Sequence, residues 1–180
     1  LAKTYRQKGQ PAHVALAGMD FDFPPGALNV VMGVSGCGKS TLAKILAGYV
    51  TPDAGTVTCD GQPITGPGPD RLMVFQESTL WPWMTVRENV IFGPVSRGED
   101  RKGAVAAAED LLARFGLSEF ADRYPRQLSG GMMRRAEIAQ ALINKPRIMI
   151  LDEPFRGLDV MTRELMQEYY VRLFEETGLS

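Results

Sequence analysis

Hydrophobic positions along the chain follow a strand-like spacing in some stretches and a helical spacing in others. Short, mainly apolar runs of strand length occur at Ala27–Met32, Arg71–Phe75 and Ile148–Leu151. Residues 14–23 alternate between apolar and polar side chains, so we expect residues 1–32 to form an antiparallel β region. Thr56–Cys59 is a further short strand, which Asp60-Gly61 closes with a dipeptide typical of tight hairpins.

Apolar residues three and four positions apart predict helices between these strands. The helical segments are 41–47, a segment within 84–92, 101–115, 132–143 and a last helix after Asp159. Gly48 is a candidate stop for the first, and Thr85 with Glu88 is a candidate capping box for the second. We expect a loop from Gly93 to Gly98. Residues 85–143 therefore predict a mostly helical insertion within an α/β chain.

Composition narrows the class of protein. The 180 residues suffice for one domain, or one domain with a subdomain. The 20 basic and 21 acidic residues give no sign of a nucleic-acid-binding surface. Two cysteines, Cys37 and Cys59, fit a reducing cytoplasm. We see neither a membrane-spanning stretch nor a signal peptide, and the missing initiator Met leads us to expect further chain before Leu1.

The stretch Gly33–Thr41 fits G-x-x-x-x-G-K-[ST], the phosphate-binding loop, between a predicted strand and a predicted helix. Gly36 and Gly38 let successive N–H groups point inward, beside the positive end of the helix. Lys39 supplies a charge for the β- and γ-phosphates, and the Ser40 hydroxyl suits Mg²⁺. A glycine-rich turn before a helix is the simpler alternative.

Two carboxylates follow the apolar run Ile148–Leu151. Ligands gather at the carboxyl ends of parallel strands, where Asp152 could hold Mg²⁺. Glu153 could orient and deprotonate a water that attacks the γ-phosphate. Alone, such a pair could be two solvated acids at a strand end. Together with the phosphate loop, it predicts a nucleotide hydrolase.

A third motif, Leu128–Met132, opens the 132–143 helix with Ser-Gly-Gly. A hydroxyl and bare N–H groups at a helix N-terminus offer an anion site, although a helix cap with flexible glycines would look the same. Its order, between the phosphate loop and the acidic strand, favours the anion site. One nucleotide loop with two phosphate-binding elements implies a site shared between subunits.

These motifs resemble those of the nucleotide-binding subunit of ATP-binding cassette (ABC) transporters. GVSGCGKST is similar to Walker A, IMILDEP to Walker B, and LSGGM to the signature LSGGQ, from which it departs in its last residue. Gln76 matches the Q-loop, Phe155–Asp159 the D-loop, and Tyr5 the aromatic residue that stacks on adenine, although Tyr5 could equally be a strand residue. The resemblance runs over nearly all of the chain.

The resemblance implies a P-loop NTPase (RecA-like) fold with a parallel sheet core, an antiparallel β subdomain and an inserted helical subdomain. The core would comprise 1–84 and 144–180, and the helical signature subdomain 85–143. ATP and Mg²⁺ are the implied cofactors. The implied nucleotide-binding residues are Tyr5, Gly33, Ser35, Gly36, Cys37, Gly38, Lys39, Ser40, Thr41, Ser129, Gly130, Gly131 and Asp159. The implied metal ligands are Ser40, Gln76 and Asp152, and the implied catalytic residues are Glu153, Gln76 and Lys39.

The resemblance also implies partners. They are a second ABC ATPase subunit, transmembrane permease subunits and, indirectly, a solute-binding protein, with the chain at the cytoplasmic face of the membrane. Phe75–Val86 is most similar to importers of nitrate, sulfonates and taurine. A soluble ABC ATPase of DNA repair, chromosome maintenance or translation is one alternative, and a P-loop kinase is another, which leaves LSGGM unexplained.

Several residues depart from the family pattern or allow two interpretations. The family's switch His has no counterpart before Ser180, so we expect further chain there, and we interpret His13 as a surface or hairpin residue. Arg156 stands where the family has a small D-loop residue, and it could be a surface charge or could perturb the dimer contact. Two further pairs need a structure: Trp81 and Trp83, which meet a membrane subunit or pack in a core, and Arg134 and Arg135, which we interpret as solvated helix charges.

Overall fold

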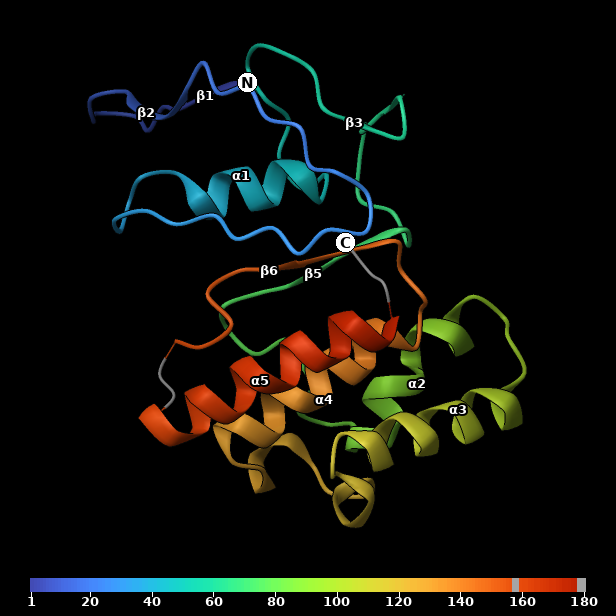
Figure 1. The fold of residues 1–180 in the computed structure, drawn as a ribbon. Helices are drawn as coiled ribbons and strands as arrows, with labels where there is room; N and C mark the ends of the chain where they lie inside the picture. Colours follow the sequence, from blue (N-terminus) through green and yellow to red (C-terminus); the bar gives the residue numbers. More distant parts are fainter. Residues whose placement is uncertain (157–158, 178–180) are drawn as a thin grey trace. The chain divides into compact units, whose positions relative to one another are not determined.

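The computed structural model describes residues 1–156 and 159–177, which divide into two compact units (Figure 1). Leu1–Met73 and Arg147–Asp152 form the first, which we call the N-terminal unit. Val74–Pro146 and Glu153–Thr177 form the second, which we call the helical unit. Both units contain helices, and the described strands lie in the N-terminal unit apart from the last residue of one.

The N-terminal unit opens with an antiparallel hairpin, as the sequence predicts. Strand β1 (Ala2–Tyr5) pairs with β2 (His13–Ala17), and the register shifts between Lys3 and Thr4. The predicted alternation up to residue 23 does not extend the strand, because the chain turns at Gly18, whose φ is 76°. The β region is therefore shorter than the sequence suggests.

Helix α1 (Lys39–Leu46) packs on this hairpin through its apolar side. Leu42 and Ile45 are buried against Leu16 of β2. The helix ends as predicted, because Ala47 is its C-cap and Gly48 follows with a φ of 82°. The apolar packing fixes α1, and with it the loop that precedes it.

The prediction of a strand over Ala27–Met32 is wrong. In the part of the chain that the structure describes, this stretch pairs with no strand. Its side chains from Leu28 onward are exposed, Val30 at 74% and Met32 at 87%. An apolar run becomes a strand only where a neighbouring strand satisfies its backbone N–H and C=O groups. The composition of the run did not show whether such a neighbour was available.

Two small sheets complete the N-terminal unit. β3 (Thr58–Cys59) and β4 (Gln62–Pro63) form the predicted hairpin, and both Asp60 and Gly61 between them have positive φ. β5 (Arg71–Val74) pairs with β6 (Ile148–Leu151), which confirms both predicted strands. The pairing brings the end of β6, and the acidic residue after it, into this unit.

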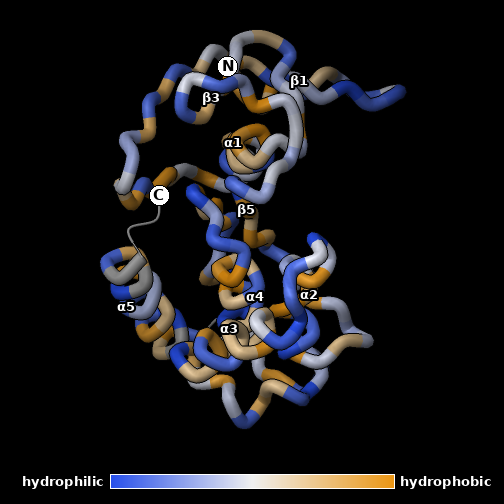
Figure 2. The backbone as a smooth tube through the Cα atoms, turned by 90° about the vertical axis from the view of Figure 1, so that its right-hand side faces the viewer, coloured by the Kyte–Doolittle hydropathy of each residue, from blue (hydrophilic) through white to orange (hydrophobic). Residues whose placement is uncertain are grey.

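The helical unit is built from α2 (Val86–Ser96), α3 (Arg101–Arg114), α4 (Gly130–Leu142) and α5 (Val160–Thr177). Two 3-10 turns, Ser118–Phe120 and Pro125–Gln127, precede α4. Helices α2, α3 and α4 pack on one another around buried Val90, Leu112 and Ile138. Figure 2 shows hydrophobic and hydrophilic residues interspersed in these helices. No residue of α4 from Gly131 to Leu142 is exposed, so this helix is covered on more than one side. The predicted subdomain boundaries at 85 and 143 stay a prediction.

Helix α2 begins as predicted and ends later than predicted. Thr85 and Glu88 form the capping box. The prediction of a loop over Gly93–Gly98 is wrong, because α2 continues through Pro94 to Ser96. Pro94 lies in the last turn, where it removes only one helical bond. Gly93 serves close packing, since a Cβ there would lie 2.3 Å from Asn144 Oδ1.

Candidate functional site

The phosphate loop leads into α1 along a backbone path that only glycine allows. Gly36 and Gly38 have φ values of 81° and 99°, and Gly38 is the N-cap of α1. A Cβ on Gly38 would lie 2.3 Å from the backbone oxygen of Ala15. The loop thus leads directly into the start of a helix, whose positive end favours anions.

Lys39 folds back over the loop that it follows. Its ammonium donates to the backbone oxygens of Gly33 at 2.8 Å and Val34 at 2.9 Å. The thiol of Cys37, which is exposed, lies 3.9 Å from the same ammonium. A positive charge therefore stands directly beside the phosphate loop.

Ser40 and Asp152 meet although 112 positions separate them in the chain. The Ser40 hydroxyl donates to Asp152 Oδ1 at 3.0 Å. Asp152 directly follows β6 and is only 7% exposed. A hydroxyl and a carboxylate oxygen are hard donors, and Mg²⁺ takes one or two such protein ligands besides phosphate oxygens and waters. The donor set below the phosphate loop therefore fits Mg²⁺.

Tyr5 lies on β1, in the same unit as the phosphate loop. It is 39% exposed, pairs with the exposed His13 across the hairpin, and has the Lys3 ammonium 5.8 Å from its ring centroid. Asp53 anchors this strand by accepting from Lys3 Nζ and from Thr4 N at 2.7 Å. The Lys3 hydrogen bond, and then that from the Thr4 amide, lower the pKa of Asp53. Tyr5 thus has an exposed ring on an anchored strand.

The signature motif forms the N-terminus of α4 in the helical unit. Ser129 is the N-cap, and its hydroxyl accepts from the Met132 amide at 3.3 Å. Gly130 and Gly131 are the first two helical residues, and Ser129 and Gly130 are exposed. This end of α4 presents unpaired helix N–H groups to its surroundings.

The prediction that Arg134 is a solvated charge is wrong. Arg134 is 7% exposed, Glu137 is 3% exposed, and their side chains are 2.8 Å apart. The guanidinium of Arg134 also donates to the backbone oxygens of Phe75 and Gln76. Opposite charges three positions apart on one helix were the available signal of this pair in the sequence. Arg135 is half-buried and donates to the Phe115 carbonyl at 2.7 Å.

Glu153 adopts a backbone conformation that side chains other than glycine rarely take. Its φ is 46°, which marks local strain of the kind that recurs at functional sites. Its carboxylate lies 3.4 Å from Nη1 of Arg156, whose side chain is 64% exposed. Of the D-loop residues, Asp159 precedes α5 and is exposed, whereas 157–158 lie outside the described residues.

Three aromatic rings form an exposed cluster in the helical unit. Trp83 is 65% exposed, Trp81 is 38% exposed, and their ring centroids are 5.2 Å apart. Phe92 lies 5.8 Å from Trp81. Asn89, fully buried, accepts from the Trp81 amide at 2.7 Å and donates to three carbonyls of residues 81–85. The tryptophans thus lie on the surface, above a buried amide that the sequence did not single out.

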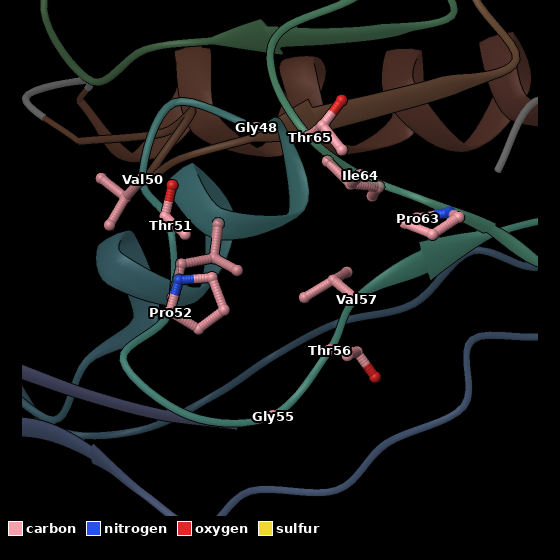
Figure 3. Close-up of a pocket in the computed structure, with 11 residues that line it drawn as sticks. Gly48, Val50, Thr51, Pro52, Gly55, Thr56, Val57, Pro63, Ile64 and Thr65 are labelled. Atoms are coloured by element: carbon pink, nitrogen blue, oxygen red, sulfur yellow. The ribbon is translucent and has the colours of Figure 1, made fainter.

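A depression of about 160 Å³ in the N-terminal unit lies apart from these residues (Figure 3). The turn after α1 forms one side, with Val50, Thr51 and Pro52, and residues around the β3–β4 hairpin form the other. Its lining is apolar residues, glycines and threonines, with no charged side chain among the residues described there. None of the predicted site residues lines it, so it offers nothing for a phosphate.

Comparison with known proteins identifies first the fold and then the family. Two solved structures of the ATP-binding cassette MJ0796, one described as a dimeric post-hydrolysis state bound to ADP and Pi, superpose with a TM-score of 0.86. Each is 31% identical in sequence to this chain, and the match covers 98% of this chain and 82% of the cassette chain. The chain therefore has a P-loop NTPase fold of mixed α/β class. The profile of the family described as "ABC transporter" matches residues 16–156, and the chain belongs to that family.

Curated relatives include several import subunits. The nitrate import ATP-binding protein NrtD of Synechocystis sp. is 45% identical over 93% of this chain and 63% of its own length. The taurine import ATP-binding protein TauB of Chromobacterium violaceum is 44% identical over 97% of this chain and 67% of its own length. The bicarbonate transport ATP-binding protein CmpC of Synechococcus elongatus is 42% identical over the whole chain and 28% of its own length. The chain thus spans between about a quarter and two thirds of these relatives.

Among the described residues, no helix is both long and apolar enough to cross a bilayer.

Proposed function

We propose that this chain is the ATP-binding and ATP-hydrolysing part of an ABC importer. The contact between Ser40 and Asp152 is the observation that carries the proposal, because it places a metal-binding hydroxyl and carboxylate together beside a phosphate loop. The names of the relatives support import of a small anion such as nitrate or the sulfonate taurine. The same names favour an importer over a soluble ABC ATPase of DNA repair or translation and over a P-loop kinase.

The phosphate loop would hold the triphosphate of ATP. The backbone amides from Gly36 to Thr41 and the start of α1 would bind phosphate oxygens. The Lys39 ammonium would exchange the Gly33 and Val34 carbonyls for the β- and γ-phosphates, to which its charge is better matched. The exposed ring of Tyr5 would stack on adenine.

Ser40 and Asp152, with Gln76, would hold Mg²⁺ and its waters. When bound, Mg²⁺ neutralises charge that develops on the phosphate oxygens. The Glu153 carboxylate would orient a water and accept its proton. The strained backbone of Glu153 supports this role, since such conformations collect at reacting residues.

The signature helix would complete the site of a second cassette. Ser129, Gly130 and Gly131 would bind the γ-phosphate of the nucleotide held by that cassette, and Asp159 would link the two sites. Exposed helix N–H groups at the start of α4 support this assignment. The partners would be a second such subunit, permease subunits and, indirectly, a solute-binding protein, with the chain peripheral at the cytoplasmic face of the membrane.

Replacement of Glu153 by Gln in the full-length protein tests the proposal. The amide cannot accept a proton, so ATP hydrolysis should fall about 100-fold or more, while ATP binding persists. The variant should accumulate as an ATP-bound dimer in size-exclusion chromatography with ATP and Mg²⁺. Glu164→Gln, at an exposed position of α5, is the matched control and should hydrolyse ATP normally. Wild-type turnover in Glu153→Gln would overturn the assignment of the base.

A further inference from the structure

The loop at 75–79 is held by two charged side chains of α4 that are buried, Arg134 and Glu137. Arg134 donates from Nη1 to the Phe75 oxygen at 2.5 Å and from Nη2 to the Gln76 oxygen at 2.7 Å. Glu137 Oε1 accepts from the Thr79 amide at 3.0 Å. Nη1 of Arg134 donates to Glu137 Oε2 at 2.8 Å, which closes the arrangement. We call these two residues the loop clamp.

The three hydrogen bonds from the clamp to the loop described above all go to backbone atoms. The clamp binds two carbonyls at the start of the loop and one amide at its end, so the path of the chain through Gln76 is fixed. The side chain of Gln76 takes no part in these bonds. The clamp therefore determines the position of the Gln76 side chain without forming a hydrogen bond to its side-chain amide.

Burying this ion pair adds little to the stability of the fold. Removing two charges from water costs about as much free energy as their mutual attraction returns, and an apolar pair of similar volume is often as stable. The guanidinium fork can donate to three acceptors at fixed angles, which a lysine cannot do. The arrangement is therefore better suited to fixing a geometry than to holding the fold together.

The position of the clamp along α4 gives it a second connection. Ser129 caps the same helix, and Arg134 lies little more than one turn after it. A rigid helix thus joins the N–H groups at Gly130 to the loop that carries Gln76. A shallow depression of about 170 Å³ lies between them, lined by Gln76, Ser78, Gly130, Met133, Arg134, Glu137 and Arg156.

We propose that Arg134 and Glu137 are positioning residues for Gln76, which tie its loop to the signature helix so that the two move as one body. The inference rests on the proposed function, since it is through ATP hydrolysis that the position of Gln76 matters. A nucleotide on the partner that engages Ser129 would act on Gln76 through the clamp. A permease that displaces the Gln76 loop would act on the signature helix by the same contacts.

The test uses the double variant Arg134→Met/Glu137→Met in the full-length protein, assembled with its permease. Two apolar side chains of similar volume keep the helix packed without an unpaired buried charge. Amide hydrogen exchange at 75–79 should become about tenfold faster or more, as expected when a hydrogen-bonded loop opens. The kcat for ATP should fall about tenfold while KM stays within about twofold, because misplacement affects the reaction and not the binding of phosphate.

Two further variants make the result specific. Arg134→Lys keeps a buried positive charge beside Glu137 but not the guanidinium fork, so it should be about as stable as the wild type and still show the fall in kcat. Arg135→Met removes the neighbouring guanidinium, which binds the Phe115 carbonyl, and should leave both exchange at 75–79 and kcat unchanged.

Unchanged exchange at 75–79 in the double variant would overturn the clamp. Faster exchange with unchanged kcat in the double variant would overturn its role in positioning Gln76, as would a wild-type kcat in Arg134→Lys. Absence of ATP hydrolysis by the assembled wild-type protein would be a failure of the proposed function instead. Hydrogen exchange alone would then show whether Arg134 and Glu137 hold the loop.

Discussion

Two loops carry the proposed chemistry. One is held in shape by residues close to it in the chain, and the other by residues far from it in the chain. The phosphate loop of the N-terminal unit is shaped by its own glycines, and the Lys39 ammonium bonds back to it from five and six positions away. The Gln76 loop of the helical unit is held by Arg134 and Glu137, buried side chains that lie 58 or 59 positions further along the chain.

The difference teaches where each loop is vulnerable. The shape of the phosphate loop depends on its own backbone conformation, so a single added methyl group within it should be enough to deform it. The shape of the Gln76 loop depends on remote polar side chains, so residues that touch no nucleotide should determine its position. Substitutions that act on one loop and spare the other are therefore the sharpest tests.

Gly38→Ala should have the largest effect. The new Cβ would lie 2.3 Å from the Ala15 oxygen at a φ of 99°, and strain of about 3 kcal/mol should weaken ATP binding about 100-fold. Titration with a fluorescent ATP analogue measures the change. Gly103→Ala is the control, because its Cβ would have ordinary contact at 3.5 Å within α3 and should raise stability by about 0.5–1 kcal/mol. Equal ATP affinity in the two variants would contradict the account.

The same contrast explains what the sequence could predict. Gly33–Thr41, the Thr85–Glu88 capping box and the Asp60-Gly61 turn are local patterns, because residues a few positions apart determine the backbone. The strand expected at 27–32 failed because strand pairing depends on a distant partner. Arg134 was misjudged for the same reason, since its acceptors lie in a loop far along the chain. The meeting of Ser40 with Asp152 was predictable only because two local motifs were combined.

Asn89→Ala should destabilise the helical unit and spare the phosphate loop. It removes the acceptor of the Trp81 amide and the donor to three carbonyls, which should cost about 2 kcal/mol of unfolding free energy. Urea denaturation followed by tryptophan fluorescence measures the loss, and ATP affinity under native conditions should not change. Asn29→Ala is the control, because Asn29 is exposed and donates to the oxygen of Ala27, only two positions away in the chain. A comparable loss in Asn29→Ala would show that burial is not the cause.

Thr85→Ala should have the smallest effect, about 1 kcal/mol at pH 7, because it removes the N-cap hydroxyl of α2. The amide and then the hydroxyl of Thr85 hold the pKa of Glu88 below its ordinary value of 4.5. The contribution of Glu88 is therefore full above that value and disappears as the pH falls through the lowered pKa. Urea denaturation at pH 7 and at pH 3 should show the wild-type advantage shrinking in acid. An advantage that does not change with pH would exclude the Glu88 contacts as its source.

The central claim is that residues 33–41 bind the phosphates of ATP with Lys39 as the cation. Calorimetric titration of the full-length wild-type protein and of Lys39→Ala with ATP and Mg²⁺ tests it most directly, and Lys44→Ala, in the last turn of α1, is the control. The loss of charge-assisted hydrogen bonds should weaken binding about 10- to 100-fold in Lys39→Ala and leave Lys44→Ala at the wild-type affinity. Equal affinity of wild type and Lys39→Ala would contradict the account.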